Sequence, residues 1–398
     1  MPRPKIAAVV TEYRRYSHAQ HILDRYLFGY GWNSRHHHPP MDLVALYTDQ
    51  QPKSDLSRER AQMFPSMKIY PSIAETLTRG GEKLAVDGVL LIGEHGQYPI
   101  NEKGQRLYPR YEFFKQIVDV YRDSGRTAPV FNDKHLSWKW EWAWEMVDTS
   151  REMDFALMAG SSLPVTRRIP PIDMPFGADV EEAVCVAVGG PDGYDIHALE
   201  AIQSMVERRR GGETGVVAIQ ALRGDAVWKA LRTGSWEKGG WSPELFEACL
   251  CRSHKLTPSR KGFNHILPTL DEMPGLLTAE AIAYRCEYAD GLKTSMLLLE
   301  GLVGDFSFAA RLKDRRDPLS TQMYLLPREE CNFFSPLVNH TETLFLTGRS
   351  PYPIERTLLT TGLTAAGVES LWLGQKRIDT PHLSINYQPS RESTYWRS

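Results

Sequence analysis

The first 160 residues alternate short apolar runs with stretches of helical spacing, and this alternation constrains the fold more than any other feature. Apolar runs of strand length occur at residues 6–10, 43–47, 86–92, 129–131 and 155–159. Segments between them repeat apolar residues every three or four positions, at residues 17–28, 72–77, 111–121 and 138–150. Buried strands separated by helices favour a parallel sheet of βαβ units. We therefore expect a Rossmann-like, doubly wound α/β domain over residues 1–163.

The pattern changes after Pro164, where four prolines within twelve residues mark a connector. Beyond it, Ala281–Tyr288 and Leu292–Leu299 flank Asp290-Gly291, a dipeptide that favours a tight hairpin turn. Further strands are expected at residues 181–188, 216–222 and 306–312, and helices at 196–209 and 354–373. Residues 164–398 are therefore expected to form an α+β domain with a mostly antiparallel open sheet, which carries substrate binding and oligomerisation.

Composition excludes several classes of protein. The chain has 47 basic and 49 acidic residues, so the basic excess typical of nucleic-acid binders is missing. No apolar run approaches the roughly 18 residues of a membrane-spanning helix. The five cysteines contain no CxxC pair, which disfavours a disulfide framework. We expect a cytoplasmic homo-oligomer that binds neither nucleic acid nor membrane, with His36–His38 in a surface loop.

Polar residues follow each predicted strand of the first domain. In an open parallel sheet, ligands bind beyond the carboxyl ends of the strands. We expect cofactor contacts from Thr11, Arg14, Asp49 and Glu94. We expect substrate contacts from His95, Asp133 and His135. Asp49 fits either a ribose ligand or a simple turn residue, and aspartate is common in turns.

The turn after the first strand has no glycine. A dinucleotide-binding turn uses G-x-G-x-x-G so that backbone amides approach the pyrophosphate. Here residues 11–18 read TEYRRYSH, with bulky side chains in those places. Arg14 or Arg15 would have to supply compensating charge, and Glu12 would oppose it.

Three segments, in order, resemble motifs of one enzyme family. Val86–Ile92 is similar to the strand "DAVxIATP", and Val130–Ser137 is similar to "VxxEKPLA", with Asp133 for Glu, Lys134 kept and His135 for Pro. Gly193–Glu200 is similar to the helix start "DxGxHxxD", with His197 and Glu200 kept and Gly193 in place of the first aspartate. The chain thus resembles the Gfo/Idh/MocA (glucose–fructose oxidoreductase and inositol dehydrogenase) family from Lys5 to about Arg209, and more loosely beyond.

The resemblance implies a Rossmann domain followed by an α/β domain, and hydride transfer between NAD(P) and a sugar or polyol carbon. By that resemblance Lys134 holds the reacting oxygen and His197 is the general base, with Glu200 at the substrate site. A cation beside a developing alkoxide and a histidine near its neutral pKa both suit such a reaction.

A second hypothesis is a metal-dependent lyase, hydrolase or isomerase on the same scaffold. Imidazole and carboxylate ligands suit a divalent metal such as Zn or Mn. The candidate ligands are His18, Glu94, His95 and His135, although no stretch has a diagnostic spacing. A third possibility is a non-enzymatic scaffold that has lost its cofactor.

Overall fold

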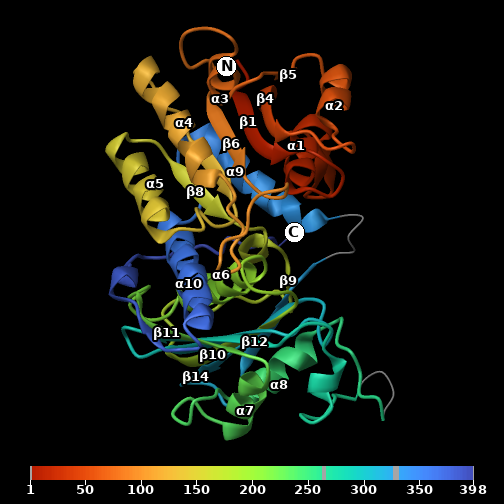
Figure 1. The fold of residues 1–398 in the computed structure, drawn as a ribbon, viewed down its shortest axis with the longest axis vertical. Coiled ribbons are helices and arrows are strands. Elements are labelled where there is room, and N and C mark those ends of the chain that lie inside the picture. Colours follow the sequence, from red (N-terminus) through yellow and green to blue (C-terminus); the bar gives the residue numbers. More distant parts are fainter. Residues whose placement is uncertain (1, 262–265, 326–330, 398) are drawn as a thin grey trace.

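A parallel sheet forms the core of the first half of the chain. The computed structural model describes residues 2–261, 266–325 and 331–397. The six strands lie in the order β5-β4-β1-β6-β7-β8, and every neighbouring pair is parallel. Their bounds are β1 (Lys5–Glu12), β4 (Asp42–Gln50), β5 (Lys68–Ile69), β6 (Gly88–Ile92), β7 (Val130–Asp133) and β8 (Leu157–Gly160). The doubly wound sheet that the alternation predicts is confirmed (Figure 1).

Helices cover both faces of this sheet. Successive residues of β1 enter two different cores, with Ala7 and Val9 in one and Ile6, Ala8 and Val10 in the other. The connecting helices are α1 (His18–Phe28), α2 (Ser57–Met63), α3 (Ile73–Thr78), α4 (Arg110–Ser124) and α5 (Trp140–Glu152). A later helix, α9 (Ser335–Thr347), packs into the second core, so the sequence after residue 330 returns to the first sheet.

An eight-stranded mixed sheet forms the other half. Its order is β16-β11-β12-β13-β10-β14-β15-β9, and only β10 and β13 pair in parallel. Its strands are β9 (Arg168–Ile169), β10 (Val180–Ala187), β11 (Val216–Arg223), β12 (Ile282–Tyr288), β13 (Lys293–Leu298), β14 (Phe306–Leu312), β15 (Leu319–Met323) and β16 (Ile378–Asp379). The predicted hairpin around Asp290-Gly291 is therefore confirmed, as β12 and β13.

Both faces of the eight-stranded sheet are covered by the chain's own helices. Helices α6 (Asp195–Val206) and α10 (Ile354–Trp372) pack on the side toward the parallel sheet. Helices α7 (Asp225–Thr233) and α8 (Pro243–Arg252) pack on the other side, around the fully buried Trp241. In Figure 1, α6 and α10 lie between the two sheets. The start of α6 lies near the carboxyl end of β7, because the carbonyl of Gly193 accepts a hydrogen bond from Lys134.

One local expectation is wrong. Residues 36–38 do not form a simple surface loop, because β3 (Arg35–His37) pairs with β2 (Tyr30–Trp32) in a small hairpin. This hairpin is anchored by His37, whose Nε2 lies 2.8 Å from a carboxylate oxygen of Glu342 on α9. Across the described ranges, no helix combines the length and apolar character that crossing a bilayer requires.

Candidate active site

A cavity of about 540 Å³ lies between the two sheets, in the range typical of small-molecule sites. Four parts of the parallel sheet's carboxyl edge line it: the β1–α1 turn and the segments after β6, β7 and β8. The second half supplies the start of α6 and the first residue of β14. The polar or aromatic lining residues central to the site are Tyr16, His18, Glu94, His95, Lys134, Tyr194, His197, Phe306 and Phe334.

Three of these lining residues have strained backbones. Tyr16, His95 and Lys134 have φ angles of 63°, 72° and 63°, in the left-handed region that non-glycine residues seldom adopt. Such conformations cost of order 1–3 kcal/mol each and concentrate at functional sites. Their convergence on one cavity supports a functional rather than a purely structural role for it.

Lys134 is held in the cavity wall by a buried ion network. Its backbone N–H donates to the carbonyl of Gly160 at 3.1 Å, which fixes the residue just after β7. Its Nζ donates to Glu94 at 2.8 Å and to the carbonyl of Gly193 at 3.3 Å. Glu94 also accepts from Arg110 at 2.5 Å. Burial by itself would raise the pKa of Glu94, but Lys134 and Arg110 hold that pKa well below its usual range.

His197 lies in the same wall, on the first turn of α6. Its ring meets Phe306 and Tyr194 edge-on, with centroids 6.1 Å and 6.0 Å away. Burial, followed by the charge of Lys134, lowers the pKa of His197 well below its usual range, so the imidazole is neutral. Its Nδ1 is buried without a hydrogen-bond partner among the described residues. A neutral imidazole beside a lysine cation is an arrangement that can accept a proton from a bound hydroxyl.

His18 and Asp133 form a second polar pair at the cavity. Asp133 ends β7 and is fully buried. One of its carboxylate oxygens lies 2.6 Å from Nδ1 of His18, at the start of α1. Asp133 therefore acts on the cavity through His18, and its own carboxylate lies behind the wall.

Glu200 supports the site from behind. It accepts a hydrogen bond from the backbone N–H of Ser161 at 2.8 Å and is fully buried. A Cβ at Gly160 would lie 2.6 Å from Oε1 of Glu200, so glycine is required where β8 ends. The structure thus places Glu200 outside the cavity lining that residues such as Lys134 and His197 form.

His135 also points away from the cavity. Its Nε2 lies 3.0 Å from a guanidinium nitrogen of Arg110, and the residue is buried. Burial and Arg110 lower the pKa of His135 well below its usual range. Within the described ranges, no three histidine, cysteine or carboxylate side chains are grouped to hold a metal ion. The geometry therefore gives the metal hypothesis no support.

The backbone N–H groups of the β1–α1 turn donate hydrogen bonds to other groups of the chain. The N–H of Arg14 and that of Gln20 both donate to Oγ of Ser17, and the N–H of Tyr16 donates to the Gln20 side chain at 2.6 Å. The N–H of His18 points at Nδ1 of His95, 3.5 Å away. The amides that bind pyrophosphate in a glycine-rich turn are thus engaged here. The phosphates of a dinucleotide at this turn would therefore need side-chain partners.

The remaining predicted cofactor residues lie around that turn. Thr11 is buried, and its hydroxyl donates to the carbonyl of Glu94 at 2.8 Å, which shapes the strand end rather than the cavity. Arg14 pairs with Glu12. Asp49 accepts from the hydroxyls of Tyr47 and Tyr98, at 2.9 and 2.6 Å. None of the three lines the cavity that contains Lys134.

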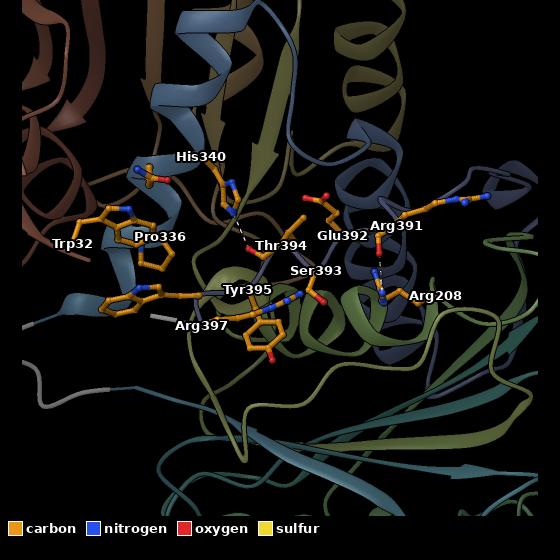
Figure 2. A pocket seen from close by; sticks show the side chains of 12 residues that line it. Trp32, Arg208, Pro336, His340, Arg391, Glu392, Ser393, Thr394, Tyr395 and Arg397 are labelled. Atoms are coloured by element: carbon orange, nitrogen blue, oxygen red, sulfur yellow. Dashed lines mark hydrogen bonds between the residues drawn. The ribbon is translucent and has the colours of Figure 1, made fainter. Parts of the chain in front are cut away.

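A larger cavity, of about 640 Å³, lies beneath the C-terminal tail (Figure 2). Its polar groups are used to hold the tail in place. Arg208 donates to the carbonyls of Ser390 and Arg391, at 2.8 and 3.1 Å, and Nε2 of His340 lies 2.7 Å from the carbonyl of Thr394. We regard this cavity as a gap between the tail and the body of the protein, because it contains none of the strand-end residues.

The sequence analysis did not identify the phenylalanines that line the cavity. Phe306 begins β14 and Phe334 precedes α9, and both close the cavity. Each stands in an apolar context typical of core, so only the fold reveals its position. Tyr194 stands within the predicted helix-start motif, which was the one available signal.

Comparisons with known proteins agree with this architecture. No family model matches the sequence, and no curated protein matches it. Among solved structures, GenD2 from gentamicin A biosynthesis in complex with NAD superposes with a TM-score of 0.57 at 11% identity, over 95% of this chain and 97% of that chain. Myo-inositol dehydrogenase from Lactobacillus casei, in complex with NAD(H) and myo-inositol, gives 0.54 at 10% identity over 95% and 97%. A probable dehydrogenase from Thermotoga maritima gives 0.54 at 11% identity over 95% and 99%. The chain therefore has the fold of these dehydrogenases over nearly its whole length.

Proposed function

We propose that this chain is a Gfo/Idh/MocA-like oxidoreductase that oxidises a hydroxyl of a sugar or polyol, with NAD(P) as its cofactor. The observation that carries the proposal is that Lys134 and His197, from opposite halves of the molecule, line one cavity. The fold likeness to dehydrogenases solved with NAD or NAD(H) supports the cofactor.

In the proposed reaction, Nζ of Lys134 binds the reacting hydroxyl oxygen and stabilises the negative charge that develops on it. Glu94 orients that Nζ through its 2.8 Å hydrogen bond. His197, neutral because it is buried, accepts the hydroxyl proton. A nicotinamide cofactor supplies the acceptor for the hydride. Phe306 and Phe334 exclude water from that end of the cavity.

Side chains, rather than amides, would hold the cofactor's phosphates. Arg15 lies on the surface of the β1–α1 turn. It donates a hydrogen bond to the hydroxyl of Tyr16, which does not neutralise its positive charge. Arg14 is a second candidate, although Glu12 offsets its charge. Asp49 completes the set of proposed cofactor residues, while Thr11 is fully buried and supports the end of β1. His95 is proposed to contact the substrate.

Calorimetric titration with NAD+ and with NADP+ tests the cofactor, and formation of reduced nicotinamide with a panel of inositols and aldoses tests the reaction. We expect Lys134→Met and His197→Ala each to lower turnover by about 10²–10⁴-fold without loss of folding. The matched control is Lys115→Met, a half-exposed lysine on α4 that should leave turnover unchanged. Absence of heat and of thermal stabilisation with both nucleotides would refute the redox proposal.

Three wider expectations remain part of the proposal. The first is a division into domains at residues 1–163 and 164–398, with α9 of the second segment returning to pack on the first sheet. The second is a homo-oligomer, which sedimentation velocity would test. The third is a reducing, cytoplasmic setting, which is consistent with the free thiols of Cys185, Cys249, Cys251 and Cys286.

A further inference from the structure

The His18–Asp133 pair has the construction of a catalytic dyad. Asp133 is fully buried, and its second oxygen, Oδ1, has no hydrogen-bond partner among the described residues. Its other oxygen, Oδ2, lies 2.6 Å from Nδ1 of His18, which is a short hydrogen bond. His18 itself reaches the cavity, with 16% of its side chain exposed.

This contact fixes the tautomer of His18. An ionised carboxylate only accepts hydrogen bonds, so the proton of a neutral His18 lies on Nδ1. The lone pair of the ring is then on Nε2, to which none of the described residues donates. The ring is also held edge-on by His95 and Phe334, with centroids 5.2 and 5.1 Å away. His18 therefore presents an oriented proton acceptor at the cavity.

His197 lacks such support. It has no carboxylate partner within the described ranges, and it is nearly enclosed, with 8% of its surface exposed. An imidazolium at His197 would face the cation of Lys134 with no counter-ion of its own. An imidazolium at His18 would be stabilised by the carboxylate of Asp133. A proton that leaves His197 therefore has in His18 an acceptor that lies beside a carboxylate.

We propose that His18, oriented by Asp133, is a second acid–base group of this site and the final acceptor of the substrate proton. The inference rests on the proposed function. The hydroxyl O–H bond breaks and its proton goes to His197. The N–H bond of that imidazolium then breaks, and the proton passes through a bound water to Nε2 of His18. The electron pair of the substrate C–H bond leaves with the hydride to the nicotinamide that the proposed function supplies, so charge and atoms balance.

Several charged and titratable groups surround His18. Asp133 after β7 contacts its ring, and the cavity that His18 lines is also lined by Glu94 and His95 after β6, Lys134 after β7, His197 on α6, and His21 one turn further along α1. Among the described residues, Asp133 alone forms a hydrogen bond to Nδ1 of the ring. Asp133→Asn therefore tests this contact and leaves the other groups in place.

Nitrogen-15 NMR of the histidine rings in the ligand-free protein tests the dyad without any assay of turnover. His18→Gln identifies the resonances of His18. We expect the neutral ring to carry its proton on Nδ1 and none on Nε2, and in Asp133→Asn we expect a mixture of the two tautomers. The control variant His36→Gln, in the exposed hairpin, should leave the His18 resonances unchanged. A neutral ring protonated on Nε2, or an unchanged tautomer in Asp133→Asn, would overturn the dyad.

Turnover provides the second arm. Asp133→Asn should lower kcat while KM changes little, and His18→Gln should lower kcat by about 10²-fold or more. Wild-type kcat in His18→Gln would overturn the proposal. If neither nucleotide binds, the proposed function fails, while the NMR result still decides whether the oriented proton acceptor exists.

Discussion

At the scale of single residues, Glu94 illustrates how burial converts an ordinary ion pair into a structural requirement. It lies between Lys134 and Arg110, and Arg110 is fully buried. The sequence placed Glu94 and Lys134 after neighbouring strands, so their proximity could be anticipated from the parallel sheet. The part played by Arg110 could not, because it begins a helix sixteen residues after Glu94 and nothing in the local pattern directs its side chain inward.

We predict that Glu94→Gln lowers the free energy of unfolding by about 3–5 kcal/mol, because it leaves two buried cations without their counter-ion. The pKa of Glu94 is lowered in the folded state, so its contribution is present above the unfolded-state pKa of about 4.3 and is lost as the pH falls below it. Urea denaturation at neutral and acid pH measures both effects. Asp119→Asn, which breaks an exposed pair with Arg122, should cost less than about 1 kcal/mol.

Gly160 carries the second prediction at this scale. Its φ is +126°, and a Cβ there would lie 2.6 Å from Glu200 and 3.0 Å from Thr357. Gly160→Ala should therefore destabilise the fold by more than about 1 kcal/mol and disturb Lys134, whose N–H it accepts. Gly190→Ala, where a Cβ meets open space, is the matched control for thermal unfolding. Equal melting temperatures for the two variants would contradict the argument.

At the scale of elements, the long periodic segments were predictable and the short or covered ones were not. Helix α10 and the β12–β13 hairpin were expected within one or two residues, because both have strong local signals. Helix α2 was not expected, since its sequence SRERAQM has no apolar stripe. The pairing of β2 with β3 depends on α9, which follows some 300 residues later, and no local pattern reports such a contact.

In helix α10, tertiary packing predicts the opposite effect of a glycine-to-alanine change from the one that helix propensity predicts. Replacing glycine by alanine within an exposed helix usually stabilises it by up to about 1 kcal/mol. At Gly367, however, a Cβ would lie 2.2 Å from the ring of Tyr284 on β12. We expect Gly367→Ala to lower the melting temperature, because the helix packs too closely on the sheet. Gly275→Ala, in open space, should not. Stabilisation by Gly367→Ala would show that Tyr284 and the sheet can shift to accommodate the added methyl group.

At the scale of the whole molecule, the resemblance of three motifs predicted the fold. It did not predict the cavity, because the cavity forms where the two halves meet. Lys134 and His197 came from the motifs, and the structure places them in one wall. The dyad of His18 and Asp133 was not predicted as a pair, because the two residues are 115 positions apart. Sequence reasoning treated them separately, as a metal candidate and a substrate contact.

The two halves are joined beside the cavity by a contact whose strength depends on pH. Asp192, just before α6, accepts from the backbone N–H of Arg106 at 2.7 Å, across the junction. Burial, with the nearby charge of Asp195, raises the pKa of Asp192 to about 7. The folded protein therefore binds a proton here that the unfolded chain releases near pH 4, so this group's contribution to stability falls as the pH rises from about 4 to 7.

We predict that Asp192→Asn removes up to about 1.4 kcal/mol per pH unit of that slope, the limit for one proton. Urea denaturation across this range measures it, and Asp271→Asn, an exposed partner of Arg232, should keep the wild-type slope. An unchanged slope in Asp192→Asn would mean that the junction is held by an ionised carboxylate.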